Sequence, residues 1–145
     1  MARLYPLDEC LGLTGGILFD TSALIDLFQY EGRNGQPSPL LLSIHPNRRY
    51  TSIISIFEFI CGISREQVRS RRAWLDDKGF RPRPVTKTVS ITFHTLIGDT
   101  VSCDLLRDLI VAATAKVEEL AVASQDTDFQ HIDGILCVAE FTGQA

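Results

Sequence analysis

Short apolar segments with the pattern of buried strands alternate with helical segments along this chain, and that alternation restricts its fold most. The run GILF at 16–19 ends at Asp20 and predicts the first strand, because a short apolar run bounded by turn signals is typical of a buried strand. Further strands are predicted at 49–56, near Val85, at 120–124 and at 135–141. Parallel strands need crossovers that cover both faces of a sheet. We therefore expect an α/β fold, a three-layer α/β/α sandwich with a mostly parallel sheet of four to five strands.

The segments between the predicted strands have the apolar spacing of helices. The first helix follows Asp20, Thr21 and Ser22, which are all N-cap candidates, and 31–39 is a loop by its composition. Further helices are predicted at 40–44, 56–63, 64–77 and 104–119. Residues 88–97 fit a strand by alternation and a helix by wider spacing, and we favour the helix.

Length and composition indicate a single globular domain. The 145 residues are 45% hydrophobic and 22% charged, which suits one domain with its own core. We assign it to residues 16–145, and we interpret residues 1–15 as an N-terminal extension, either a flexible arm or a partner contact. Asp8 and Glu9 stand where a signal peptide needs its apolar stretch, and no run of about 18 apolar residues predicts a membrane span.

The cysteines do not have the spacing of a zinc site. The four of them are far apart, with no C-x-x-C pair and no histidine cluster beside them. Each lies in or near an apolar run, so reduced, buried thiols are expected, as in a cytoplasmic protein. They are Cys10, Cys61, Cys103 and Cys137.

Charge is distributed unevenly along the chain. The formal net charge is −4, yet residues 65–87 hold eight bases and three acids, a local charge of +5, and the rest of the chain has six bases and 15 acids, a charge of −9. This asymmetry suggests a basic patch beside an acidic site. The other interpretation is an ordinary solvated surface helix.

Four carboxylates fall at positions where they can meet. Asp20 ends the first predicted strand, Glu58 lies near the start of the helix after the second, and Asp126 follows the strand at 120–124. Ligands bind at the carboxyl ends of parallel strands, which places these three at one edge. Asp108 joins them if the start of its alanine-rich helix faces the same crevice. Four convergent carboxylates would repel one another unless a cation held them, and oxygen ligands suit Mg²⁺ or Mn²⁺. Such a site activates water against a phosphate ester.

Each acid also has a purely structural explanation. Asp20 can cap the following helix, and Ser55 with Glu58 has the formal spacing of a capping box. Asp108 can interact with a helix dipole, and Asp126 can form an Asx turn. Only the meeting of all four would favour the metal site.

Four motifs of the chain resemble those of the PIN-domain family, in the same order and with similar spacing over roughly residues 16–141. They are ILFDTSALIDLF at 17–28, SIISIFEFICGI at 52–63, DLIVAATA at 108–115 and SQDTDF at 124–129. In size and layout the chain is most similar to VapC, the toxin of VapBC toxin–antitoxin pairs. The resemblance implies an Mg²⁺- or Mn²⁺-dependent endoribonuclease that cleaves single-stranded RNA and is held inactive by an antitoxin protein, commonly as a homodimer.

The resemblance also implies roles for individual residues. Asp20, Glu58, Asp108 and Asp126 take the four acidic positions that bind metal and carry catalysis. Supporting positions are Ser22, Ser124 (where threonine is usual), Asp104 and Asp128. From the basic segment, the candidates for RNA binding are Arg65, Arg69, Arg71 and Arg72.

The sequence argues against two rival functions and is compatible with two others. An aspartate-nucleophile phosphatase would need a second Asp where this chain has Ser22, and a response-regulator domain would need a lysine near its last strand, where none follows Lys116. A PIN nuclease in RNA processing, or a non-catalytic PIN-like module that binds RNA or protein, stays open.

Overall fold

The computed structural model of the chain describes residues 2–97 and 106–141. Its centre is a six-stranded sheet in the order β1-β6-β5-β2-β3-β4, and every neighbouring pair is parallel. The strands are β1 (Arg3–Tyr5), β2 (Ile17–Phe19), β3 (Arg49–Ser52), β4 (Arg81–Arg83), β5 (Ala121–Ala123) and β6 (Leu136–Val138). All are short, so the fold depends on what covers the two faces of the sheet rather than on long strands.

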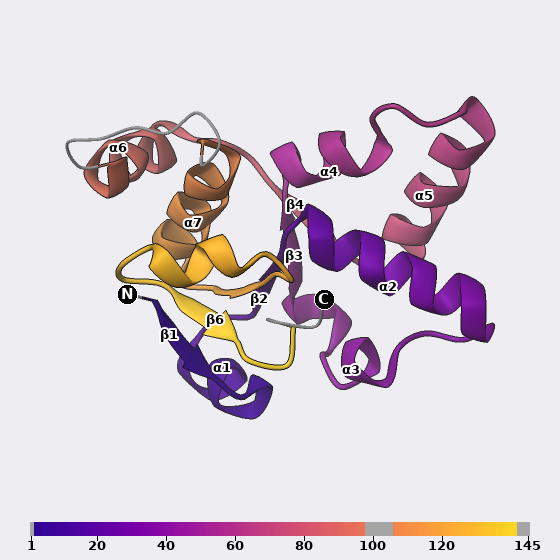
Figure 1. Ribbon diagram of the computed structural model, residues 1–145, viewed down its shortest axis with the longest axis horizontal. Helices are drawn as coiled ribbons and strands as arrows, with labels where there is room; N and C mark the ends of the chain where they lie inside the picture. Colours follow the sequence, from indigo (N-terminus) through magenta and orange to yellow (C-terminus); the bar gives the residue numbers. More distant parts are fainter. Residues whose placement is uncertain (1, 98–105, 142–145) are drawn as a thin grey trace.

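Helices cover both faces, which confirms the predicted three-layer α/β/α sandwich. In Figure 1, α6 and α7 lie to one side of the central strands, and α2 to α5 lie to the other. The α-helices are α1 (Leu7–Leu13), α2 (Thr21–Asn34), α3 (Pro39–Leu42), α4 (Ile53–Ile60), α5 (Arg65–Asp77), α6 (Lys87–Ile97) and α7 (Leu106–Glu118). Short 3-10 turns are η1 (Pro46–Arg48) and η3 (Thr127–His131). The helical interpretation of 88–97 is therefore confirmed by α6.

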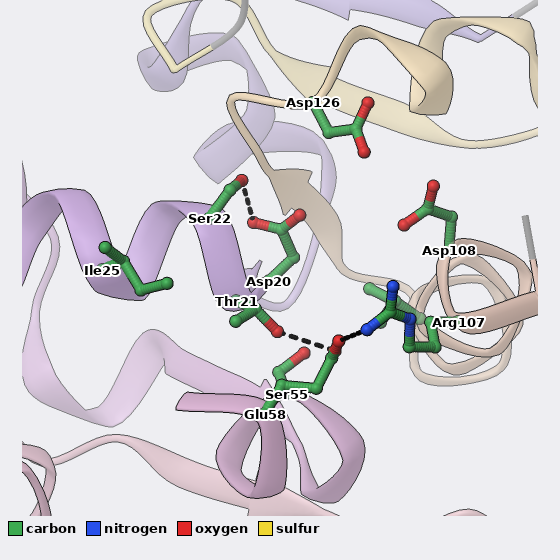
Figure 2. A pocket seen from close by; sticks show the side chains of 10 residues that line it. Asp20, Thr21, Ser22, Ile25, Ser55, Glu58, Arg107, Asp108 and Asp126 are labelled. Carbon is green, nitrogen blue, oxygen red and sulfur yellow. Dashed lines mark hydrogen bonds and ion pairs between the residues drawn. The ribbon is translucent and has the colours of Figure 1, made fainter. Parts of the chain in front are cut away.

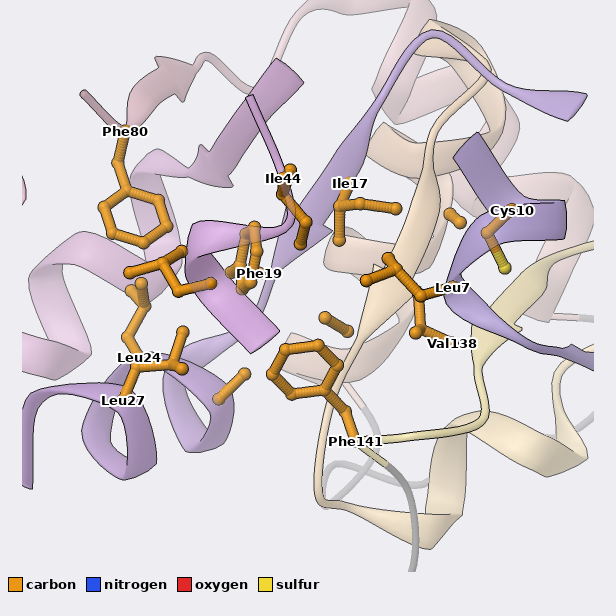
Figure 3. Packing of buried hydrophobic residues seen from close by; sticks show 14 of the residues in the cluster. Leu7, Cys10, Ile17, Phe19, Leu24, Leu27, Ile44, Phe80, Val138 and Phe141 are labelled. Carbon is orange, nitrogen blue, oxygen red and sulfur yellow. The ribbon is translucent and has the colours of Figure 1, made fainter. Parts of the chain in front are cut away.

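The central strand β2 divides the core into two layers. Ile17 and Phe19 face one cluster of buried side chains and Leu18 faces the other, as the two-residue period of a strand requires. Phe19 is fully buried, and its ring meets the rings of Phe80 and Phe141 edge-on, at centroid distances of 5.1 and 5.7 Å. Figure 3 shows these rings packed together with Leu24 and Leu27 of α2. This packing holds the start of α2 against the end of β2.

The strand count exceeds the four to five that we predicted, partly because the N-terminal residues join the sheet. Rather than forming a flexible arm, β1 pairs with β6 in register, with Arg3 opposite Leu136. The following helix α1 buries Leu7 and Cys10 in the core. These two apolar side chains stabilise the segment by burial, and the strand pairing satisfies its backbone.

The two largest errors in the predicted boundaries are at the end of β3 and at the end of α2. The strand expected at 49–56 ends at Ser52, whose side chain accepts the backbone N–H of Ile54 and begins α4. Helix capping thus overrides the strand preference of the β-branched residues that follow. The loop expected at 31–39 starts later, because α2 continues to Asn34 and ends at Gly35, which adopts φ 75°.

The cysteine prediction holds for two of the four thiols. Cys10 and Cys137 are buried and reduced, whereas Cys61 is exposed at the end of α4, which corrects the expectation for that residue. Cys103 lies outside the described residues. Among the helices of the described part, none is long and apolar enough to cross a membrane.

Candidate active site

The site lies where the chain leaves two adjacent central strands on opposite faces of the sheet. From β2 the chain enters α2, which packs on one face, and from β5 it enters η3, whose Phe129 packs on the other. The two strand ends are joined by a hydrogen bond from the Asp20 amide to the Ala123 carbonyl, 3.1 Å long. A change in the direction of winding leaves a crevice at the carboxyl ends of the strands, where ligands of open α/β sheets bind.

Asp20 is the most buried acid of this crevice, with 6% of its surface exposed. Its Oδ1 accepts the Ala23 amide at 3.0 Å and the Ser22 hydroxyl at 2.8 Å, and its Oδ2 accepts the Ser124 hydroxyl at 2.5 Å. Burial raises the pKa of Asp20 above its usual value, although the hydrogen bonds from Ser124, Ala23 and Ser22 act against that rise. The predicted helix cap is therefore real, and it also holds the carboxylate in the crevice.

The supporting serines form one network around Asp20. The Ser22 and Ser124 hydroxyls lie 3.2 Å apart. The amide of Gln125 donates to Ser22 at 3.0 Å, and the amide of Asp126 donates to Ser124 at 2.9 Å. The Ser124 hydroxyl thus links Asp20 to the loop that carries Asp126.

Glu58 reaches the crevice from α4, on the side of the pocket opposite Asp126. It lies in the second turn of α4, where Thr21 donates to its Oε1 at 2.9 Å and Arg107 forms an ion pair with its Oε2. The capping-box explanation for Glu58 is wrong, because the N-cap of α4 is Ser52 and not Ser55. Ser55 instead lines the pocket, and its buried hydroxyl has no partner among the described residues.

Three aspartates form the tightest group of acids. Carboxylate oxygens of Asp108, Asp126 and Asp128 all lie within 4.8 Å of one another. Asp126 accepts the amide of Asp128 at 2.9 Å, so the predicted Asx turn is also present. Asp108 faces the crevice from the first turn of α7. Figure 2 shows its carboxylate near those of Asp126 and Asp20.

All four predicted acids line one pocket of about 240 Å³. Its walls come from α2, α4, α7 and the loop after β5, and they are formed by Asp20, Thr21, Ser22, Ile25, Ser55, Glu58, Arg107, Asp108, Val111 and Asp126. The structure therefore brings together segments that are up to about a hundred residues apart in sequence, as the strand polarity predicted for three of the four.

The pocket holds its negative charge at an energetic cost. Burial, and then the charges of Asp126, Asp20 and Asp128, raise the pKa of Asp108 to about 7, while Arg107 acts in the opposite direction. A cation among these carboxylates would relieve the repulsion, and an all-oxygen donor set with a spare buried hydroxyl suits a hard divalent ion.

The PIN family model matches residues 17–135, which is most of the chain. The chain belongs to the PIN-domain family. The match begins at β2, so β1 and α1 precede the part that this PIN domain shares with the model. No curated protein matches the sequence.

Solved structures with this fold include toxin–antitoxin assemblies. The PIN domain is similar to a toxin–antitoxin complex from Klebsiella pneumoniae, with 25% identity and a TM-score of 0.62 over 83% of this chain and 95% of that one. FitAcB from Neisseria gonorrhoeae has 23% identity and a TM-score of 0.60 over 86% and 98%. DNA-bound VapBC from Salmonella typhimurium has 19% identity and a TM-score of 0.60 over 84% and 96%. At identities of 23% and 19%, the similarity to FitAcB and to VapBC shows a shared fold and nothing more.

Sequence reasoning missed three polar residues that line the pocket of this PIN domain, namely Thr21, Ser55 and Arg107. Thr21 was considered only as a helix cap and Ser55 only as part of a capping box. A sequence signal existed for Arg107, since it directly precedes Asp108 at the start of α7. Its contact with Glu58 joins residues that are 49 positions apart, and no local pattern reports it.

The four arginines predicted to bind RNA all lie on α5, but their surroundings differ. Arg65, Arg69 and Arg72 lie exposed on α5, away from the pocket walls. Arg71 packs over the rings of Phe28 and Phe59, with its guanidinium carbon 5.3 and 4.7 Å from the ring centroids, and it donates to the Phe59 carbonyl. These contacts give Arg71 a structural role of its own. Asp104 lies outside the described residues.

Replacing Asp108 by Asn is expected to stabilise the metal-free PIN domain at alkaline pH. The pKa of Asp108 is about 4 in the unfolded chain, and burial with the neighbouring acids raises it to about 7 in the folded chain. The ionised carboxylate therefore costs stability that grows from about pH 4 to pH 7 and is complete above that. After allowance for partial exposure, Asp108→Asn should raise the free energy of unfolding by about 1–2 kcal/mol at about pH 8.

Urea unfolding in EDTA at several pH values measures this effect. The gain from Asp108→Asn should shrink as the pH falls toward 4, because the wild-type folded chain then carries the neutral acid. A gain that is the same at all pH values would show that charge at Asp108 is not its cause.

Proposed function

We propose that this PIN domain is a metal-dependent endoribonuclease that cleaves single-stranded RNA. The observation that carries the proposal is the convergence of Asp20, Glu58, Asp108 and Asp126 on one pocket at the carboxyl edge of the sheet. Family membership supports nuclease chemistry in general. A module that only bound RNA would gain nothing from acids that repel phosphate and raise the pKa of Asp108.

In this proposal the acids bind Mg²⁺ or Mn²⁺. Asp108 and Asp126 are the central ligands, with Asp128 beside them and Asp20 and Glu58 on the other walls of the pocket. When bound, the metal would lower the pKa of a coordinated water and offset charge on the phosphate. Ser22 and Ser124 orient Asp20, and Thr21 orients Glu58, so both carboxylates have defined positions before a substrate arrives.

We further propose that the enzyme is the toxin of a toxin–antitoxin pair, with an antitoxin protein as its partner and a homodimer as its assembly. Support comes from the similarity in fold to the toxin–antitoxin complex of Klebsiella pneumoniae, which covers 95% of that chain. The exposed Phe57 on α4 offers apolar surface for an interface. The alternative of an RNA-processing enzyme shares the same chemistry and differs in partner.

The metal requirement tests the proposal directly. Cleavage of labelled single-stranded RNA is expected with Mn²⁺ or Mg²⁺ and should fall to background in EDTA, because the carboxylates alone repel the substrate phosphate. Addition of Mn²⁺ in excess of the chelator should restore activity. Equal cleavage with and without EDTA would overturn the metal mechanism, and no cleavage under any of these conditions would overturn the nuclease.

A further inference from the structure

Arg107 is the only cationic side chain among the residues that line the acidic pocket in the described part of the chain. It stands at the start of α7, directly before Asp108. Figure 2 shows its guanidinium beside Glu58, on the wall of the pocket across from Asp126. A positive group thus lines a pocket whose other charged groups are all negative.

The contact that Arg107 makes now is one that it can exchange. Its partner is the Oε2 of Glu58, and 66% of the Arg107 side chain is exposed to solvent. Ion pairs this exposed contribute little to stability, since water competes for both partners. Thr21 holds the other carboxylate oxygen of Glu58 at 2.9 Å, so Glu58 keeps one fixed hydrogen bond when Arg107 leaves. Arg107 is therefore free to change partners without loss of the Glu58 position.

An RNA phosphate would be a better partner for Arg107 than Glu58 is. Cations bound by the aspartates would attract an RNA phosphate to this pocket, and the wall of the same pocket also carries the Arg107 side chain. A guanidinium can donate two parallel hydrogen bonds to phosphate, which a compact ammonium cannot match. A cation that neutralises Glu58 would at the same time weaken the attraction that keeps Arg107 in its present contact.

We propose that Arg107 is a substrate-binding residue that leaves Glu58 and grips a phosphate group of the RNA at the cleavage site. This inference rests on the proposed nuclease function and adds to it a specific contact for the substrate. The competing explanation is that Arg107 only holds Glu58 in place for the metal. The two explanations differ in what the loss of Arg107 does to substrate binding and to metal binding.

The test compares Arg107→Gln, Arg107→Lys and the control Arg33→Gln with the wild-type chain. Arg33 is exposed in the last turn of α2, about 18 Å along that helix from Thr21, so its replacement removes the same charge away from the pocket. For each protein, KM and kcat for a short labelled oligouridylate are measured with Mn²⁺ over a series of KCl concentrations. Mn²⁺ binding to the RNA-free proteins is measured by titration calorimetry.

For Arg107→Gln we expect KM to rise about tenfold or more, from the loss of a charge-assisted contact. The slope of log KM against log salt should fall by about 0.7, the value for one lost phosphate contact on a single strand. Arg107→Lys should keep the wild-type slope with an intermediate KM, because the charge remains and the paired geometry is lost. Mn²⁺ affinity should be unchanged or tighter in both variants.

Two results would overturn the proposal while the nuclease stands. One is an Arg107→Gln protein with the KM and salt slope of Arg33→Gln. The other is an Arg107→Gln protein whose Mn²⁺ binding is lost, which would assign Arg107 to the support of Glu58. Failure of the nuclease function itself is visible separately, as absence of metal-dependent cleavage by the wild-type chain.

Discussion

Asp20→Asn is expected to reduce Mn²⁺-dependent cleavage of single-stranded RNA by more than about 100-fold. Residues that merely orient metal ligands typically contribute about 10–100-fold in affinity or activity, and a ligand in direct contact should contribute more. Asp20 has only 6% of its surface exposed and is oriented by Ser22 and Ser124, so no neighbouring side chain can take its place. The measurement is the initial rate of cleavage at saturating Mn²⁺.

The fold should survive this substitution, which makes the result interpretable. Asn is as good an N-cap as Asp and can still accept the Ala23 amide. The matched control is Asp26→Asn on the same helix, since Asp26 lies outside the acidic pocket and its loss should leave the rate unchanged. Circular dichroism should show native spectra for both variants.

The same pair of variants tests the toxin proposal in cells. Induction of the wild-type chain or of Asp26→Asn should arrest growth, and induction of Asp20→Asn should not. A wild-type cleavage rate for Asp20→Asn would contradict the metal site. Growth that is unaffected by the active wild-type enzyme would instead favour the RNA-processing alternative.

Phe19→Ala is expected to lower the free energy of unfolding by about 3–5 kcal/mol, the largest effect on stability that we anticipate. Phe19 is fully buried at the centre of the sheet and contacts the rings of Phe80 and Phe141. Its removal would leave a cavity that the surrounding strands cannot fill, because β2 is hydrogen-bonded on both sides. Domains of this size have a free energy of unfolding of about 5–15 kcal/mol, so much of the stability would be lost.

Urea unfolding followed by tryptophan fluorescence measures this effect, since Trp74 packs against Phe80 in the same core. The control is Phe57→Ala, which removes a ring that is 57% exposed and should change stability far less. Similar losses for the two variants would show that the β2 core is not the main source of stability.

The sequence was sufficient to predict the fold class and the meeting of Asp20, Glu58 and Asp126 at one edge of the sheet. The hydrophobic period and the Asp that ends the first apolar run are local properties of the sequence. The polarity of parallel strands then places their carboxyl ends, and the acids that follow them, at one edge of the sheet. The sequence was weaker at element boundaries, as at Ser52, where one side-chain cap decides between strand and helix. It was weak again for residues 1–15, because nothing local shows that β1 pairs with β6.

Local pattern alone determined that Asp20 and Asp126 follow strands and that Asp108 lies early in a helix. Only the tertiary structure decided that α7 turns its first residues into the crevice. Asp108 therefore lies near Asp126 and Asp128, where burial and their charges raise its pKa to about 7. The tertiary structure also decided that Arg107 meets Glu58 across 49 positions of sequence. The physical reason is that electrostatic energy depends on distance in space and on burial, and neither quantity exists until the helices pack on the sheet.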